Sequence, residues 1–315
     1  MAGSPPSIRL GSRSSILARW QAEEVQRRLA AAGVAAEVVW IRTSGDRMQS
    51  GPLAAIGGKG LFTKELEEAL LARRVDAAVH SLKDVPTDVP PGLALGAVLE
   101  REDPRDALVA APGTTLASLP ASARLGTASL RRQAQLLALR PDLKCIPLRG
   151  NVDTRLQRWR AGEFDAIVLA CAGLRRLGLE AVIAERLDPG HCCPAAGQGA
   201  LAIECRAGDA AVLGAIARLN HAPTSLAVAA ERAVLRRLQC GCDTPVGAYA
   251  SWHAGQLRLA AVVAVPDGTQ VLRSCMQRNL APQDLGAAEA LGTETGDDLL
   301  AQGAREILLA CESAP

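Results

Sequence analysis

The stretch Arg124-Leu125-Gly126-Thr127-Ala128-Ser129-Leu130 decides the fold, because its opening repeats one that stands near the start of the chain. The earlier copy is Arg9-Leu10-Gly11-Ser12. Each copy leads into a serine and then into an amphipathic helical pattern. Segments 75–79 and 164–168 also correspond, since each is a strand-like apolar run that follows a helical one. Two βαβ passes with matching openings predict two similar α/β lobes.

The first lobe begins with a strand at residues 8–10 and a helix that Gly33 ends. The same periodicities predict further elements there: a strand at 38–41, a helix through Phe62, Leu66 and Leu70, and a strand at 75–80. A strand-like run at 200–204 is expected to return the chain to this lobe. We therefore place lobe 1 at residues 1–99 with 200–218, and lobe 2 at 100–199.

The remaining residues, 219–315, predict a smaller α+β domain, because the order of patterns changes there. It is expected to contain a helix at 223–239, strands at 246–251, 257–265 and 271–276, and helices at 283–291 and 297–310.

Composition excludes several classes of protein. Apolar residues make up 49% of the 315 residues, so a large core is available, while a net charge of +2 and 2% aromatic residues argue against nucleic-acid binding. No apolar run reaches the roughly 18–20 residues that span a bilayer, and the N-terminus does not resemble a secretory signal. Nine cysteines, an odd number, predict reduced thiols and a cytoplasmic location without membrane attachment.

Four short motifs have more than one interpretation. The segment 57–60 lacks the spacing of a phosphate-binding Walker loop, and 197–202 precedes a strand instead of opening a dinucleotide-binding helix, so both predict ordinary loops. His191-Cys192-Cys193 and Cys240-Gly241-Cys242 are candidate halves of a zinc site, although buried thiols are the commoner explanation. For the pair Cys240 and Cys242 the residues alone also leave a disulfide or a nucleophile open.

Arginines gather where predicted strands end and helices begin. Arg13 and Arg131-Arg132 stand beside the openings of two helices, and helix N-termini attract anions. Arg149 and Arg155 flank another such turn, and Arg176 follows a predicted strand at 167–170. Ligands of open α/β sheets bind at the carboxyl ends of the strands. The pattern therefore favours a cleft for a ligand with several carboxylates or phosphates over arginines that merely face solvent.

Asp84 is the exception among these cations, since it ends a strand of lobe 1 directly after Lys83. Nearby positive charge would keep its carboxyl ionised. Such a group can stabilise a developing cation or hold a pyrrole-like N–H. The alternative is an ordinary turn or surface salt bridge.

Taken together, these motifs resemble the porphobilinogen deaminase family. The matching stretches occur in family order over nearly the whole chain: Arg13 to Ala18, Gly58 to Leu66, His80 to Pro86, Gly126 to Gln133, Leu148 to Leu156, Ala172 to Gly178, Pro194 to Ala200, and Gly241-Cys242 before Pro245-Val246-Gly247.

The resemblance implies a transferase of tetrapyrrole and heme biosynthesis. Its members condense four porphobilinogen molecules, with loss of ammonia, onto a dipyrromethane primer, and water then releases hydroxymethylbilane. The primer is a cofactor held through a thioether, and the match assigns this bond to Cys242 and not to Cys240. The resemblance further implies a monomer with two periplasmic-binding-protein-like lobes, the cofactor between them, and a third domain carrying the cysteine.

The same resemblance gives expected roles to individual residues. Asp84 is expected to be catalytic, and the loop with Lys59 and Phe62 to cover the active site. The positions expected to bind the cofactor are Ser81, Lys83, Thr127, Ser129, Arg131, Arg132, Arg155, Gly199 and Cys242. Those expected to bind porphobilinogen or the growing polypyrrole are Arg13, Ser15, Gln21, Arg149 and Arg176.

Three positions depart from the usual family pattern: Cys240 stands where glycine is common, Ala128 replaces a frequent serine, and Cys192-Cys193 replaces larger apolar residues. Cys240 is therefore a possible competitor for the pyrrole. A binding or regulatory module without catalysis is the alternative class on the same lobes, and it would carry no covalent pyrrole.

Overall fold

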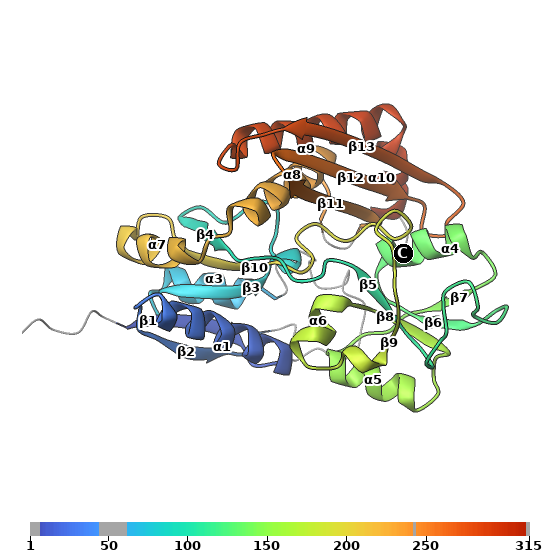
Figure 1. Cartoon of the computed structure of the whole chain (residues 1–315), viewed down its shortest axis with the longest axis horizontal. Helices are drawn as coiled ribbons and strands as arrows, with labels where there is room; N and C mark the ends of the chain where they lie inside the picture. The colour runs from blue at the N-terminus through green and yellow to red at the C-terminus, as the bar shows by residue number, and fades with distance from the viewer. Residues whose placement is uncertain (1–6, 44–61, 242–243, 313–315) are drawn as a thin grey trace, which may run out of the picture. The chain divides into compact units, whose positions relative to one another are not determined.

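A computed structural model describes residues 7–43, 62–241 and 244–312 (Figure 1). The chain divides into two compact units, one formed by Met1–Arg101 with Ala200–Ser225 and the other by Glu102–Gly199 with Leu226–Pro315. Each unit has its own apolar cores, two in unit 1 and three in unit 2 among the described residues. The finer division into three domains at the residues given above stays a prediction.

Unit 1 is built on one mixed sheet. Its strands are β1 (Ile8–Arg13), β2 (Ala36–Ile41), β3 (Ala77–Ser81), β4 (Leu93–Val98) and β10 (Leu201–Arg206), in the order β2-β1-β3-β10-β4. β1 runs parallel to β2 and β3, whereas β10 is antiparallel to both of its neighbours. The expectation that the segment near residue 200 returns to the first lobe is confirmed.

Helices cover both faces of this sheet. They are α1 (Ile16–Ala31), α3 (Lys64–Leu71) and α7 (Ala210–Ile216), with short 3-10 turns η2 (Leu82–Asp84) and η4 (Ala217–Leu219). α1 and α7 share one apolar core with the sheet, and α3 packs into a second core. Ser15 begins α1, because its hydroxyl accepts a hydrogen bond from the N–H of Ala18.

The first part of unit 2 repeats this plan. Its strands are β5 (Asp106–Val109), β6 (Arg124–Gly126), β7 (Lys144–Ile146), β8 (Ala166–Ala170) and β9 (Ile183–Arg186), in the order β7-β6-β8-β5-β9. β6 is parallel to β7 and β8, and β5 is antiparallel to both of its neighbours, as β10 is in unit 1. The prediction of two similar α/β lobes is confirmed.

The repeated sequence motif has a packing reason. Its helix in unit 2, α4 (Leu130–Leu139), is followed by α5 (Val152–Arg160), α6 (Cys171–Arg176) and the turn η3 (Glu180–Val182). A Cβ atom on Gly11 would lie 3.1 Å from the side chain of Val75, and one on Gly126 would lie 2.8 Å from the ring of Phe164. The glycine of each copy thus leaves room for the residue that leads into the neighbouring strand.

The rest of unit 2 is a three-stranded antiparallel sheet with helices. Its elements are α8 (Ala222–Leu238, whose first residues lie in unit 1), β11 (Val246–His253), β12 (Gln256–Ala264), β13 (Val271–Asn279), α9 (Leu285–Ala301) and α10 (Ala304–Glu312). The strand order is β11-β12-β13, and α9 packs on β12 and β13 (Figure 1). The expected smaller α+β architecture is confirmed.

One expected helix boundary is wrong. Helices were predicted at 283–291 and 297–310, but α9 continues through that gap, and the break falls at Gly303, whose φ is +100°. Gly292 and Gly296 lie inside α9 because α8 passes close to them. A Cβ on Gly292 would lie 2.6 Å from the Cβ of Ala233, and one on Gly296 would lie 2.8 Å from the side chain of Arg237.

Candidate active site

A small pocket in unit 1 brings together side chains from the ends of β1 and β3. Its polar lining includes Arg13, Gln21, His80, Ser81 and Asp84, with Phe62 and Thr63 at the start of α3. β1 delivers its last residue and β3 delivers the turn η2 at the same end of the sheet, since the two strands are parallel neighbours. The structure therefore gathers here four of the residues that the sequence assigned to substrate, cofactor or catalysis, together with Phe62 of the expected cover.

Hydrogen bonding orders the back of this pocket. The buried amide of Gln21 donates to the hydroxyl of Ser81 at 2.9 Å. The guanidinium of Arg13 lies 4.2 Å from the centre of the Phe62 ring, a cation–π contact. Asp84 is half-buried at the end of η2, where its carboxylate borders the same pocket as Arg13. The pocket thus offers a guanidinium for a substrate carboxylate and a carboxylate for a developing cation.

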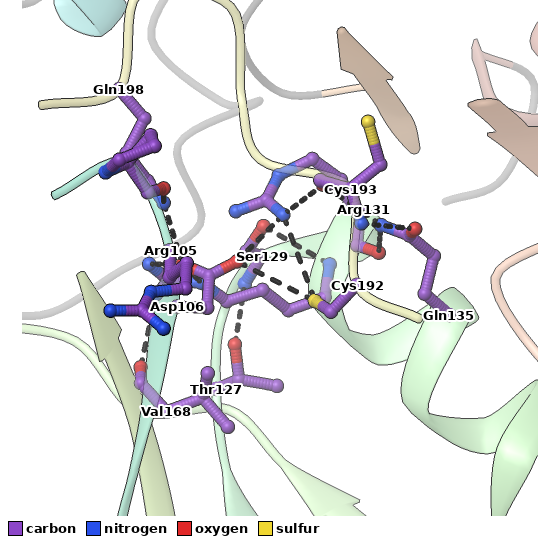
Figure 2. Close-up of polar contacts among 12 residues, drawn as sticks. Arg105, Asp106, Thr127, Ser129, Arg131, Gln135, Val168, Cys192, Cys193 and Gln198 are labelled. Carbon is purple, nitrogen blue, oxygen red and sulfur yellow. Dashed lines mark hydrogen bonds and ion pairs between the residues drawn. The ribbon is translucent and has the colours of Figure 1, made fainter. Parts of the chain in front are cut away.

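Unit 2 centres on one buried carboxylate, Asp106, at the start of β5 (Figure 2). Arg131 donates to Oδ2 at 2.8 Å, and Arg132 donates to Oδ1 through both Nε at 3.0 Å and Nη2 at 2.7 Å. The amide of Gln198 donates to Oδ1 at 2.9 Å, and the thiol of Cys192 lies 3.5 Å from Oδ2. The sequence motifs do not point to Asp106, although an aspartate that opens a buried strand is a signal of an internal ion pair.

The opposite charges of this cluster keep one another ionised. Burial alone would raise the pKa of Asp106, but the charges and hydrogen bonds of Arg131 and Arg132 outweigh it and hold that pKa well below the usual range. Burial would likewise lower the pKa of Arg131, and the charge of Asp106 raises it instead. Two guanidinium groups share one carboxylate, so the cluster keeps a net positive charge.

Both arginines are less accessible than the sequence suggested. They were expected to line an open cleft, but Arg131 is 4% and Arg132 5% exposed, and both already bind backbone carbonyls, those of Cys193 and Val168. The residues that begin α4 are tied together as well, because Ser129 caps the helix. The hydroxyl of Thr127 accepts a hydrogen bond from the N–H of Ser129 at 3.2 Å.

The remaining predicted arginines hold loops of unit 2. Arg155 donates to the carbonyl of Gly150 at 2.7 Å, across the turn that also contains half-buried Arg149. Arg176, at the end of α6, donates to the carbonyl of Gly199 at 2.7 Å. Gly199 adopts a φ of +88°, which a residue with a Cβ rarely tolerates.

The described cysteines that the sequence motifs single out, Cys192, Cys193 and Cys240, are all buried. Cys192 and Cys193 are buried, and burial is the main reason that the pKa of each rises to about 12, so both stay protonated. Cys240 is also buried, in the apolar core between α8 and the three-stranded sheet, with its sulfur 3.7 Å from the carbonyl of Leu235. Among the described residues no cluster of three metal-binding side chains occurs. Cys242 and Lys59 lie outside the described residues.

Family models match the chain over both of its units. The model of the porphobilinogen deaminase dipyrromethane cofactor binding domain matches residues 8–214, and that of the porphobilinogen deaminase C-terminal domain matches residues 225–301. The chain belongs to the porphobilinogen deaminase family. It is accordingly a transferase, a hydroxymethylbilane synthase, that condenses porphobilinogen in tetrapyrrole biosynthesis with a dipyrromethane cofactor.

Three solved structures are similar to this chain at low sequence identity. A putative methionine-binding lipoprotein from Bacillus subtilis is 14% identical, with a TM-score of 0.42 over 68% of this chain and 90% of that one. Lipoprotein Tp32 from Treponema pallidum is 13% identical, with a TM-score of 0.43 over 68% and 90%. A periplasmic substrate-binding protein of an ABC transporter from Coxiella burnetii is 15% identical, with a TM-score of 0.42 over 69% and 93%.

Within each unit, taken by itself, there are residues that suit a ligand rich in carboxylates. The excess positive charge around Asp106 is buried, where an anionic group from a ligand would compensate it. Separately, the pocket of unit 1 is lined by the side chains of Arg13 and Ser81. In the described part of the chain, no helix is both long and apolar enough to cross a bilayer.

Proposed function

We propose that the pocket of unit 1 is where porphobilinogen loses ammonia, with Asp84 as the catalytic carboxylate. Loss of ammonia leaves a methylene-pyrrole cation, which a nearby fixed negative charge stabilises. The observation that supports this role is the shared pocket of Asp84, Arg13 and Ser81. Arg13 is then positioned for a substrate carboxylate, and Ser81, held by Gln21, for a hydrogen bond to ligand.

We propose that the second group of residues holds the side-chain carboxylates of the pyrroles. Each pyrrole ring bears an acetate and a propionate, so a dipyrromethane presents four carboxylates. Arg131 and Arg132 supply buried positive charge that Asp106 compensates only in part. The other proposed contacts of cofactor or growing chain come from the turns and helix starts described above: Ser15, Lys83, Thr127, Ser129, Arg149, Arg155, Arg176 and Gly199.

We propose Cys242 as the residue that carries the cofactor. Its neighbour Cys240 is 9% exposed and packs in an apolar core, which disfavours it as the attachment point. When bound, dipyrromethane supplies the free pyrrole carbon to which the first porphobilinogen is joined. Lys59 and Phe62 are proposed to belong to a loop that excludes water from the pocket.

Intact mass tests the attachment. The purified protein is expected to exceed its sequence mass by two linked pyrroles, and Cys242→Ser is expected to lose this excess. Cys240→Ser serves as the matched control and is expected to retain it. An excess lost only with Cys240 would move the anchor, and no excess after incubation with porphobilinogen would contradict the function itself.

We further propose a cytoplasmic monomer. Its support is that no disulfide joins two of the described cysteines, as in a reducing compartment, and that the exposed large apolar side chains belong to several separate elements. Light scattering of the purified protein should give the chain mass of 32.8 kDa. A mass of twice that value at micromolar concentration would contradict the monomer.

A further inference from the structure

A buried polar cluster lies between α3 and the sheet of unit 1, directly behind the pocket that carries Asp84. His80, which lines the pocket, places its Nε2 3.0 Å from Oε2 of Glu204 on β10. Their side chains are 3% and 0% exposed. Glu67 lies on α3, which packs against β3 and β10, and its Oε1 is buried. The charges of His80 and Glu204 both act on its carboxyl.

The two carboxyl groups of this cluster are incompletely satisfied. Oε1 of Glu204 and Oε1 of Glu67 are buried and accept no hydrogen bond from any side chain or backbone group of the described residues. An ionised carboxylate in such surroundings loses hydration without recovering it, whereas a protonated carboxyl carries no charge. Burial is the main cause that raises the pKa of Glu67, and the negative charge of Glu204 raises it further.

Few other charges reach this position. α3 packs against β1, β3, β4 and β10. The charged or titratable groups on these elements and on η2 are Arg9, Arg13, His80, Lys83, Asp84, Glu204, Cys205 and Arg206, and α3 itself adds Lys64, Glu65 and Glu68. Arg9 and Arg206 pair with Asp76, which precedes β3 at the end opposite His80. Among the described residues, no basic side chain forms an ion pair with Glu67.

We propose that Glu67, with His80 and Glu204, forms a proton-holding cluster that limits the negative charge behind the Asp84 pocket, and that Glu67 acts as a positioning residue for substrate binding. This role rests on the function proposed for the pocket. While Glu67 holds its proton, the cluster carries one net negative charge at most. When Glu67 ionises, a second negative charge appears one helical turn behind Thr63 in the pocket wall.

Ionisation of Glu67 is expected to weaken the binding of porphobilinogen more than it slows the reaction. Porphobilinogen brings two carboxylates to a pocket that already contains Asp84, so an added negative charge repels it. At a separation of roughly 10 Å in a protein interior, one extra charge changes affinity about three- to tenfold after screening. The KM for porphobilinogen is therefore expected to rise with pH as Glu67 ionises, with kcat changing much less.

The proton itself is tested without turnover. Carboxyl carbon NMR of glutamate-labelled protein should show Glu67 titrating at higher pH than Glu68, the exposed neighbour on the same helix. The Glu67 resonance is assigned by its loss in Glu67→Gln. In Glu204→Gln the Glu67 midpoint should move to lower pH, because the repelling charge is gone. A Glu67 midpoint equal to that of Glu68 would overturn the proposal, whatever the activity.

Kinetics then tests the role in binding. KM and kcat are measured against pH for the wild type, Glu67→Gln and the control Glu68→Gln. Glu67→Gln should remove the rise in KM, while Glu68→Gln should keep it. If Glu67 holds its proton by NMR but KM is unchanged by the substitution, the positioning role is wrong. If no protein condenses porphobilinogen, the proposed function fails, and the NMR result still decides the cluster.

Discussion

At the scale of single residues, aspartate–arginine ion pairs contribute very differently to the free energy of unfolding, depending on whether they are buried. Asp106 is buried with Arg131 and Arg132, and Asp142 is exposed with Arg140. An exposed pair contributes about 0–1 kcal/mol, because water and salt screen it. Removing one partner of a buried pair leaves charge uncompensated and costs about 3–5 kcal/mol.

The buried cluster gives the first stability prediction. Asp106→Asn should lower the free energy of unfolding by about 3–5 kcal/mol, since two guanidinium groups lose their carboxylate. Because the folded pKa of Asp106 is depressed, its contribution is present above the unfolded pKa and is lost as pH falls through the folded pKa. Urea unfolding at pH 7 and below pH 4 measures both effects. Asp142→Asn is the control, and equal losses for the two variants would contradict the prediction.

The catalytic assignment gives a second prediction. Asp84→Asn should reduce turnover by about 10²–10³-fold, the typical effect of losing one electrostatic stabiliser of a transition state. It should change stability by less than about 0.5 kcal/mol, because Asp84 is only half-buried. Steady-state assays and thermal unfolding check the two parts. Asp88→Asn, on the exposed turn that follows, should keep full activity; activity of Asp84→Asn equal to this control would refute the role.

The residue scale also shows what a sequence can and cannot predict. The pocket of Arg13, Ser81 and Asp84 was predictable, because each residue stands at a strand end and strand ends of a parallel pair meet. The partners of Asp106 were not, since they lie at least 25 positions away along the chain. Because they pair with Asp106, Arg131 and Arg132 are buried instead of lining an open cleft. Their position at the start of a predicted helix does not reveal this burial.

At the scale of elements, glycine has opposite meanings in neighbouring helices. Gly303 ends α9 with a left-handed backbone, which a helical pattern easily predicts. Gly292 and Gly296 look like the same signal but lie within the helix, where α8 passes too close for a side chain. The sequence alone does not show which partner helix will approach, so the predicted interruption at 292–296 was wrong.

The helix contact gives a third prediction. Gly292→Ala should destabilise the protein by about 1–3 kcal/mol, because its Cβ would meet the backbone and side chain of α8. Gly286→Ala is the control in the same helix, since its Cβ would meet nothing closer than 3.9 Å. That change should be neutral or stabilising by up to ~1 kcal/mol. Chemical unfolding of both variants measures the difference, and a neutral Gly292→Ala would contradict the close approach.

At the scale of the whole molecule, residues 193–197 link the two parts of unit 2, the second lobe and the three-stranded sheet. The carbonyl of Cys193 accepts hydrogen bonds from Arg131 and Gln135, while the N–H of Gly197 donates to the buried carboxylate of Glu231 on α8. Glu231 also accepts from the N–H of Ala250 on β11. The second lobe and the three-stranded sheet therefore share their buried polar contacts and should unfold together.

The four tryptophans test this joint unfolding. Trp159 reports on the second lobe, Trp252 on the three-stranded sheet, and Trp20 and Trp40 on unit 1. In variants that keep one tryptophan each, urea transitions seen by Trp159 and Trp252 should coincide in midpoint and slope. Separate midpoints for these two probes would show that the shared segment does not couple them.

The place of β10 has a consequence for the protein during its synthesis. β10 lies between β3 and β4, yet the ribosome makes it only after the 98 residues that separate the two segments of unit 1. At roughly 5–20 residues per second, β4 waits about 5–20 s for its partner. During that interval the nascent first lobe exposes an unpaired strand edge, which makes it a client for the chaperones that attend translation.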